Sequence, residues 1–130
     1  MDNVRVGVIG LGIMGSDHAA DLQQGRVKRA RLTAVCDALP ANLARIRNVE
    51  HFGEPGAMIG SGLVDAVMIA TPHYAHTTIG IAALNHGLHV MVEKPISVHK
   101  ADAGRLIAAH KNKKQVFAVM FNLRAAPIYQ

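Results

Sequence analysis

The chain opens with an apolar stretch that runs directly into three glycines spaced G-x-G-x-x-G, and this feature constrains its fold most. The stretch is Val4 to Ile9, the glycines are Gly10, Gly12 and Gly15, and Asp37 follows where a second apolar stretch ends. Gly10 permits a tight strand-to-helix turn, Gly12 lets a pyrophosphate approach the backbone, and Gly15 lets the helix pack closely on the sheet. The pattern predicts a dinucleotide-binding site at the start of a helix.

Asp37 indicates which dinucleotide is expected. A carboxylate at the end of a second strand accepts hydrogen bonds from ribose hydroxyls and repels a 2′-phosphate. Ala38 and Leu39 offer no positive charge to compensate, so NAD is favoured over NADP. Arg45 lies one or more helical turns further on, from where it can reach back. A plainer role, in which Asp37 only caps the next helix, stays open.

The rest of the chain alternates apolar strands with helices. Strands are expected at 4–9, 32–37, 66–70, 90–92 and 116–120, with a short strand at 51–52, and helices at 13–24, 40–47, 74–85 and 100–111. The details of 49–62 stay open. The continuous apolar run at 66–70 belongs in the centre of a sheet. Parallel strands joined by right-handed helical crossovers fit this order, so we expect one α/β domain with a Rossmann-type, doubly wound parallel sheet.

Composition narrows the function classes. The 130 residues fit one domain, and the formal net charge of +5 raises the question of nucleic-acid binding. The basic residues fall in separate groups without interleaved aromatic side chains, so no nucleic-acid partner is expected. The apolar runs are too short to span a bilayer, and no signal peptide opens the chain. The single Cys36 excludes an internal disulfide and fits a reducing compartment, so a cytoplasmic location is expected.

Four ordered motifs resemble the N-terminal half of the Gfo/Idh/MocA oxidoreductases, the relatives of glucose-fructose oxidoreductase and inositol dehydrogenase. They lie at 10–18, 36–37, 70–76 and 87–95, so the resemblance covers essentially the whole chain. It implies a dinucleotide-binding domain over 1–121, with 122–130 starting the connection to a C-terminal substrate domain that is absent. It also implies a truncated chain, the NAD-binding half of a homo-oligomeric enzyme that transfers a hydride to or from a sugar or polyol alcohol.

The resemblance also assigns site residues. It implies that Lys94 is catalytic and that Arg124 faces the substrate. The residues expected to contact the cofactor are Gly10, Gly12, Ile13, Met14, Gly15, Asp37, Thr71, Pro72, His73, His76, Glu93, Lys94 and Asn122. Leu123 and Ala125-Ala126 depart from the Gln and Thr-Asn often seen in the family. This departure weakens the case for polar contacts in that segment.

The sequence Glu93-Lys94-Pro95 carries a chemical argument of its own. Oxidation of a secondary alcohol by hydride transfer needs a group that takes the hydroxyl proton, and a lysine at the carboxyl end of a parallel strand is well placed. Glu93 is expected to hold or tune the ammonium, and Pro95 makes Lys94-Pro95 a candidate cis bond. Taken alone, Lys94 is better explained as a solvated strand-end charge, and the family resemblance reverses that preference.

The histidines and the alternative functions complete the expectations. His73 and His76 are three positions apart, as in some metal sites, but further ligands are missing, so no metal is expected. His18 is expected to pack or to hydrogen-bond locally. A non-catalytic dinucleotide-binding sensor or regulator is the alternative function, and a Rossmann methyltransferase is more distant. The Glu93-Lys94-Pro95 sequence favours the enzyme, because a sensor needs no poised lysine.

Overall fold

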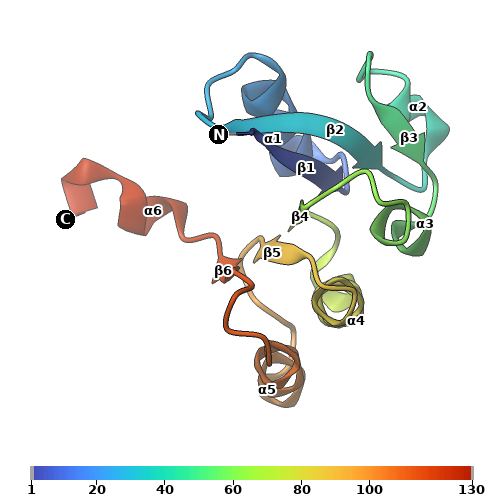
Figure 1. Ribbon diagram of the computed structural model, residues 1–130. Helices are drawn as coiled ribbons and strands as arrows, with labels where there is room; N and C mark the ends of the chain where they lie inside the picture. The colour runs from blue at the N-terminus through green and yellow to red at the C-terminus, as the bar shows by residue number, and fades with distance from the viewer. Residues whose placement is uncertain (1, 130) are drawn as a thin grey trace.

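The computed structural model describes residues 2–129 and shows one parallel sheet with helices on both faces (Figure 1). The six strands have the order β3-β2-β1-β4-β5-β6, and every neighbouring pair is parallel. The strands are β1 (Val4–Ile9), β2 (Ala30–Cys36), β3 (Glu50–Phe52), β4 (Ala66–Ile69), β5 (His89–Val92) and β6 (Phe117–Val119). This order confirms the predicted Rossmann-type fold and the inner position of the 66–70 strand.

The helices alternate with the strands along the chain. They are α1 (Ile13–Gln23), α2 (Pro40–Leu43), α3 (Pro55–Ile59), α4 (His76–Asn85), α5 (Lys100–Ala109) and α6 (Asn122–Ala125), with 3₁₀ turns η1 (His73–Ala75) and η2 (Pro127–Tyr129). None of the helices in residues 2–129 has the length and apolar character that a bilayer crossing requires.

Two apolar clusters pack against opposite faces of the sheet, as in a doubly wound fold. On one face, Val8 of β1 packs with Ala19 and Leu22 of α1. On the other face, Ile9 packs with residues of α3, α4 and α5, including the fully buried Leu106. Successive strand residues point to opposite faces, so the continuous apolar strands supply both clusters.

Several predicted boundaries differ from the structure. The helix predicted over 40–47 ends at Leu43, because the chain continues in tighter turns, with Arg45 N–H donating to Asn42 O and Ile46 N–H to Leu43 O. The helix predicted over 74–85 is divided into η1 and α4. The last strand is shorter than the predicted 116–120, while the segment left open at 49–62 contains β3 and α3.

The carboxyl ends of the strands are aligned in one row across the sheet. Cys36, Ile9, Ile69 and Val92 are paired in sequence across β2, β1, β4 and β5. The N–H of the next residue in three strands donates to the neighbouring strand: Gly10 to Cys36 O, Ala70 to Ile9 O and Glu93 to Ile69 O. The residues that leave the strands therefore start from a common edge, and the predicted site residues lie there.

Candidate functional site at the carboxyl edge of the sheet

The turn from β1 into α1 requires glycine at two positions for reasons internal to the protein. Gly10 has φ +93°, and a Cβ there would lie 2.7 Å from the carbonyl carbon and oxygen of Ala70. A Cβ on Gly15 would overlap the carbonyl oxygen of Gly10. Because both neighbours are backbone atoms, the turn and the close helix contact depend on these glycines.

Gly12 is different, because nothing in the protein lies within 4 Å of the place where its Cβ would be. Its backbone is extended, with φ −69° and ψ −159°, a conformation open to any residue. The absence of a side chain therefore leaves space at the surface rather than relieving a clash. Such a space suits the close approach of a pyrophosphate, so the glycine turn fits a dinucleotide.

The first turn of α1 faces the same space. Its first intrahelical bond runs from Ser16 N–H to Gly12 O, at 3.0 Å, so the preceding N–H groups have no partner within the helix. Gly12 is the N-cap and supplies no side-chain cap. Ile13 and Met14 are 84% and 41% exposed. Unpaired N–H groups and the positive end of the helix dipole favour an anion at this position.

Asp37 lies beside this turn and is tied to it. One carboxylate oxygen accepts the Leu11 N–H and the other accepts the Leu39 N–H, both at 2.8 Å. Burial opposes ionisation, but these bonds, together with Asn42 and Arg45, lower the pKa of Asp37 below its ordinary value. The carboxylate is therefore ionised near neutral pH and keeps lone pairs for further donors, such as ribose hydroxyls.

Arg45 reaches back, as the sequence allowed, but it bonds to the glycine turn. Its guanidinium donates to Leu11 O at 2.8 Å and to Asn42 Oδ1 at 3.1 Å. The same cation that helps to lower the pKa of Asp37 thus also fixes the backbone next to Gly12. Sequence reasoning did not single out Asn42, because only the folded chain places it beside Arg45.

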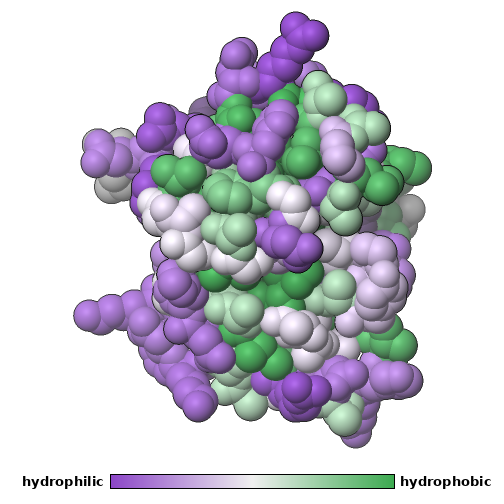
Figure 2. Space-filling model, turned by 90° about the vertical axis from the view of Figure 1, so that its right-hand side faces the viewer, coloured by the Kyte–Doolittle hydropathy of each residue, from purple (hydrophilic) through white to green (hydrophobic). Residues whose placement is uncertain are grey.

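A cavity of about 610 Å³ joins the glycine turn to Asp37. Its lining includes Gly10, Gly12, Asp37, Asn42, Glu54, Thr71, Pro72 and Tyr74. Glu54 was not predicted, although it follows β3 and so reaches the same edge of the sheet. Figure 2 views the molecule from the side to which β1 and β2 point and shows apolar residues exposed among polar ones in the waist between the upper and lower parts.

Cys36 also lines the cavity, where burial raises the pKa of its thiol to about 12, so the thiol stays protonated.

The two predicted histidines after β4 have different surroundings. His73 is exposed in η1, whereas the His76 side chain is fully buried. The His76 ring lies with one nitrogen 3.0 Å from Pro95 O and the other 3.0 Å from Thr71 O. This burial differs from the expected cofactor contact, because no surface of His76 is left for a ligand. Residues 2–129 contain no cluster of three or more His, Cys, Asp or Glu side chains that could hold a metal ion.

Lys94 lies at the carboxyl end of β5 and is exposed. The Lys94-Pro95 peptide bond is cis. A second cavity, of about 510 Å³, is lined by Lys94, Phe121, Asn122, Leu123 and Arg124. The structure therefore gathers the predicted Lys94, Asn122 and Arg124 around one space.

The expected contact between Glu93 and Lys94 is absent from residues 2–129. The Glu93 carboxylate instead lies 2.5 Å from Nε2 of His18, a residue that was expected to pack or to hydrogen-bond locally. This pair could not be predicted from the sequence, because its two members are 75 positions apart.

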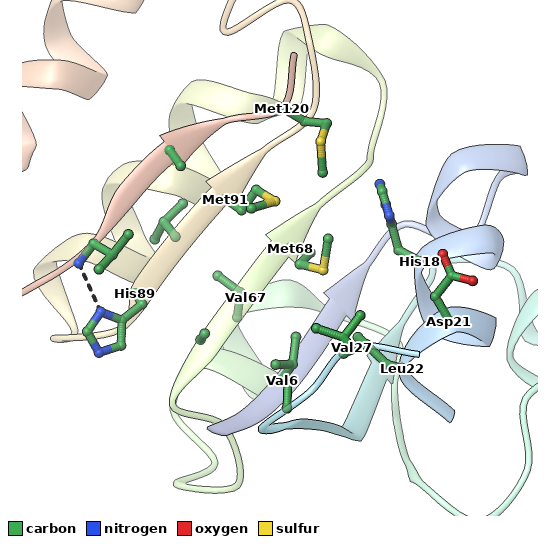
Figure 3. A pocket seen from close by; sticks show the side chains of 15 residues that line it. Val6, His18, Asp21, Leu22, Val27, Val67, Met68, His89, Met91 and Met120 are labelled. Atoms are coloured by element: carbon green, nitrogen blue, oxygen red, sulfur yellow. Dashed lines mark hydrogen bonds between the residues drawn. The ribbon is translucent and has the colours of Figure 1, made fainter. Parts of the chain in front are cut away.

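A third hollow is apolar and lies on the sheet face beside α1 (Figure 3). It encloses about 500 Å³, and its floor includes Met68 of β4, Met91 of β5 and Met120, which directly follows β6. Only a few polar side chains, among them His18 and Asp21, reach it. A dinucleotide needs converging polar partners, so the cavity between Gly12 and Asp37 is the better candidate.

Comparison with known proteins agrees with this geometry. The family model described as an oxidoreductase family with an NAD-binding Rossmann fold matches residues 4–121. Inositol 2-dehydrogenase 1 of Saccharopolyspora erythraea is 37% identical over 110 residues, which cover 81% of this chain and 32% of that protein. Myo-inositol 2-dehydrogenase of Thermotoga maritima is 33% identical over 125 residues, 93% of this chain and 37% of that protein.

Solved structures give the same result. Scyllo-inositol dehydrogenase from Lactobacillus casei, crystallised with NAD(H) and scyllo-inositol, superposes with a TM-score of 0.88 at 29% identity, over 97% of this chain and 38% of that one. The WlbA dehydrogenase from Bordetella pertussis, in complex with NADH and UDP-GlcNAcA, gives a TM-score of 0.90 at 27% identity, over 98% and 40%. The chain thus spans about a third of the length of the curated relatives that it matches. It belongs to the Gfo/Idh/MocA oxidoreductase family, whose cofactor domain is an NAD-binding Rossmann fold.

Proposed function

We propose that this chain is the NAD-binding half of an oxidoreductase that transfers a hydride between the nicotinamide cofactor and an alcohol group of a sugar or polyol. The observation that carries the proposal is the common edge of the sheet. There the open space at Gly12 follows β1, the ionised Asp37 follows the adjacent β2, and the exposed Lys94 follows β5, on the far side of β4. The named relatives support the polyol class, since several are inositol dehydrogenases.

Each residue has a role that follows from its surroundings. The N–H groups at the start of α1 bind the pyrophosphate, and Asp37 accepts hydrogen bonds from the adenosine ribose. Bound NAD supplies the hydride acceptor. Lys94 exchanges a proton with the substrate hydroxyl at its Nζ, while Asn122 and Arg124 supply polar groups around the same space.

Other parts of the proposal concern the whole protein. A cytoplasmic location fits the single buried thiol of Cys36. A homo-oligomer fits the apolar hollow that contains Met68, Met91 and Met120, because exposed apolar patches of this kind favour association. Sedimentation velocity over a range of concentrations tests this assembly, and a monomer throughout would contradict it.

Turnover requires a substrate pocket, so we expect the 130-residue chain alone to show no appreciable activity.

Calorimetric titration with NAD and NADP tests the cofactor assignment. NAD should bind more tightly, and Asp37→Asn should reduce the difference, because the repulsion of a 2′-phosphate disappears. Asp17→Asn is the matched control, since Asp17 is exposed on α1. Equal affinities for the two nucleotides in the unmodified chain would refute the role of Asp37. NAD binding without any Lys94-dependent turnover in a full-length protein would favour a regulator.

A further inference from the structure

The turn that carries Lys94 is held at its first residue by helix α1. The Glu93 carboxylate pairs with His18 Nε2, and the two side chains are only 11% and 15% exposed. Figure 3 shows His18 projecting from α1 beside the strands that carry Met68 and Met91. Hydrogen bonds to a carboxylate are stronger than neutral ones, and burial strengthens them further. The helix whose first turn faces the proposed phosphate site thus also fixes Glu93.

The same turn is held from the other side by helix α4. The buried ring of His76 lies between Pro95 O and Thr71 O, at 3.0 Å from each. A neutral ring donates to one of these carbonyls, and an imidazolium donates to both. Thr71 lines the proposed cofactor cavity, so His76 connects the turn that carries Lys94 to the wall of that cavity. On the next residue of α4, Thr77 Oγ1 lies 3.0 Å from Ser97 Oγ.

These contacts alternate along the turn. Glu93, Pro95 and Ser97 each lie within hydrogen-bond distance of a side chain on a helix, while Lys94 between Glu93 and Pro95 is exposed. Among residues 2–129, no hydrogen bond or ion pair reaches the Lys94 ammonium. The backbone on both sides of Lys94 is thus fixed, and its side chain is left available. A reactive group supported by buried hydrogen bonds is the arrangement that precise positioning requires.

We propose that His18 and His76 are positioning residues for Lys94, which clamp the backbone of its turn from α1 and α4. The two histidines contact neither cofactor nor substrate and act through Glu93 and Pro95. The use of Lys94 in hydride transfer rests on the proposed function, whereas the clamp itself is a property of this chain. The two claims can therefore fail separately.

The clamp is tested by ¹⁵N relaxation of the Lys94 amide in the 130-residue chain. The unmodified chain should give an order parameter of about 0.85 at Lys94. His18→Leu should lower the order parameter toward about 0.6 at the amides of Glu93 and Lys94, while the rest of the sheet is unchanged. His18→Gln should restore most of the order, because its amide can still donate to Glu93. His86→Leu is the matched control, since His86 is exposed at the end of α4.

A second variant protects the test from a folding defect. If His18→Leu does not fold, Glu93→Ala removes the same bond from the other side and carries the same expectation. In a full-length enzyme containing this chain, His18→Leu should lower kcat at least tenfold with an unchanged KM for NAD, and His18→Gln should recover it. An unchanged order parameter at Lys94 in the folded His18→Leu and Glu93→Ala variants would overturn the clamp. Absence of NAD binding by calorimetry would instead refute the proposed function.

Discussion

Substitution by alanine should leave the stability nearly unchanged at Gly12 but lower it at Gly15. At Gly12, alanine meets no protein atom within 4 Å, and its backbone angles are ordinary. Reduced freedom of the unfolded chain stabilises by about 0.4–1 kcal/mol, and the loss of a good N-cap residue costs about as much. The net change for Gly12→Ala is therefore small, and the melting temperature should stay within about 4 °C of the unmodified chain.

At Gly15, the added carbon overlaps the carbonyl oxygen of Gly10, so the helix or the turn must move. Overpacking of this kind costs about 1–3 kcal/mol. With an unfolding entropy of about 2.1 cal/mol/K per residue, the melting temperature should fall by about 4–11 °C. The two variants thus separate a glycine that the fold needs from one that the ligand needs.

Thermal unfolding by circular dichroism and NAD titration by calorimetry together test this reasoning. Gly12→Ala should bind NAD at least about tenfold more weakly while melting normally, and Gly12→Val should abolish binding. Gly15→Ala should show the lower melting temperature given above. Normal NAD affinity in Gly12→Ala, or equal destabilisation by the two alanines, would refute the roles given to these glycines.

Three further predictions concern the core, the acid limb of stability and catalysis. Leu106→Ala, at a fully buried side chain, should cost about 2–5 kcal/mol in urea unfolding, and a loss below about 1 kcal/mol would contradict its place in the core. The hydrogen bond from Arg5 lowers the pKa of Asp65, and hydrogen bonds lower the pKa of Asp37 although burial opposes this shift. Both carboxyl groups therefore stabilise the fold at pH values above the pKa that they have in the unfolded chain. The free energy of unfolding should therefore be steady between about pH 5 and 8 and fall below about pH 4, and a pH-independent value would be contrary evidence. In a full-length enzyme, Lys94→Met should lower kcat by about 10²–10⁴ with little change in NAD affinity, Lys94→Arg should not restore it, and a near-normal kcat would make Lys94 a mere surface charge.

The fold could be predicted because its signals are local. The apolar run before Gly10 and the glycine spacing locate β1 and α1, and the continuous run at 66–70 has the composition of an inner parallel strand. The 49–62 segment could not be resolved from sequence, since α3 is only five residues long and has little room for periodicity. Its place against the sheet is decided by tertiary packing of Met58 and Ile59.

The site was predictable in its residue types but not in its contacts. The sequence placed Asp37 and Lys94 at strand ends, yet it could not show that Arg45 binds Leu11 O or that His18 binds Glu93. Both contacts join segments that are distant along the chain. The burial of His76 was also invisible, because a histidine in a motif looks the same whether it faces a ligand or a backbone carbonyl.

What brings these residues together is the register of the sheet. Cys36, Ile9, Ile69 and Val92 form one paired row, and each is at most 1% exposed. A slip of one residue in any strand would turn its buried side chains to the opposite face, so packing on both faces fixes the row. Asp37, Gly10 and Glu93 are the next residues after that row. The geometry of the candidate site is therefore a direct consequence of core packing, and that packing requires glycine at positions 10 and 15 but not at position 12.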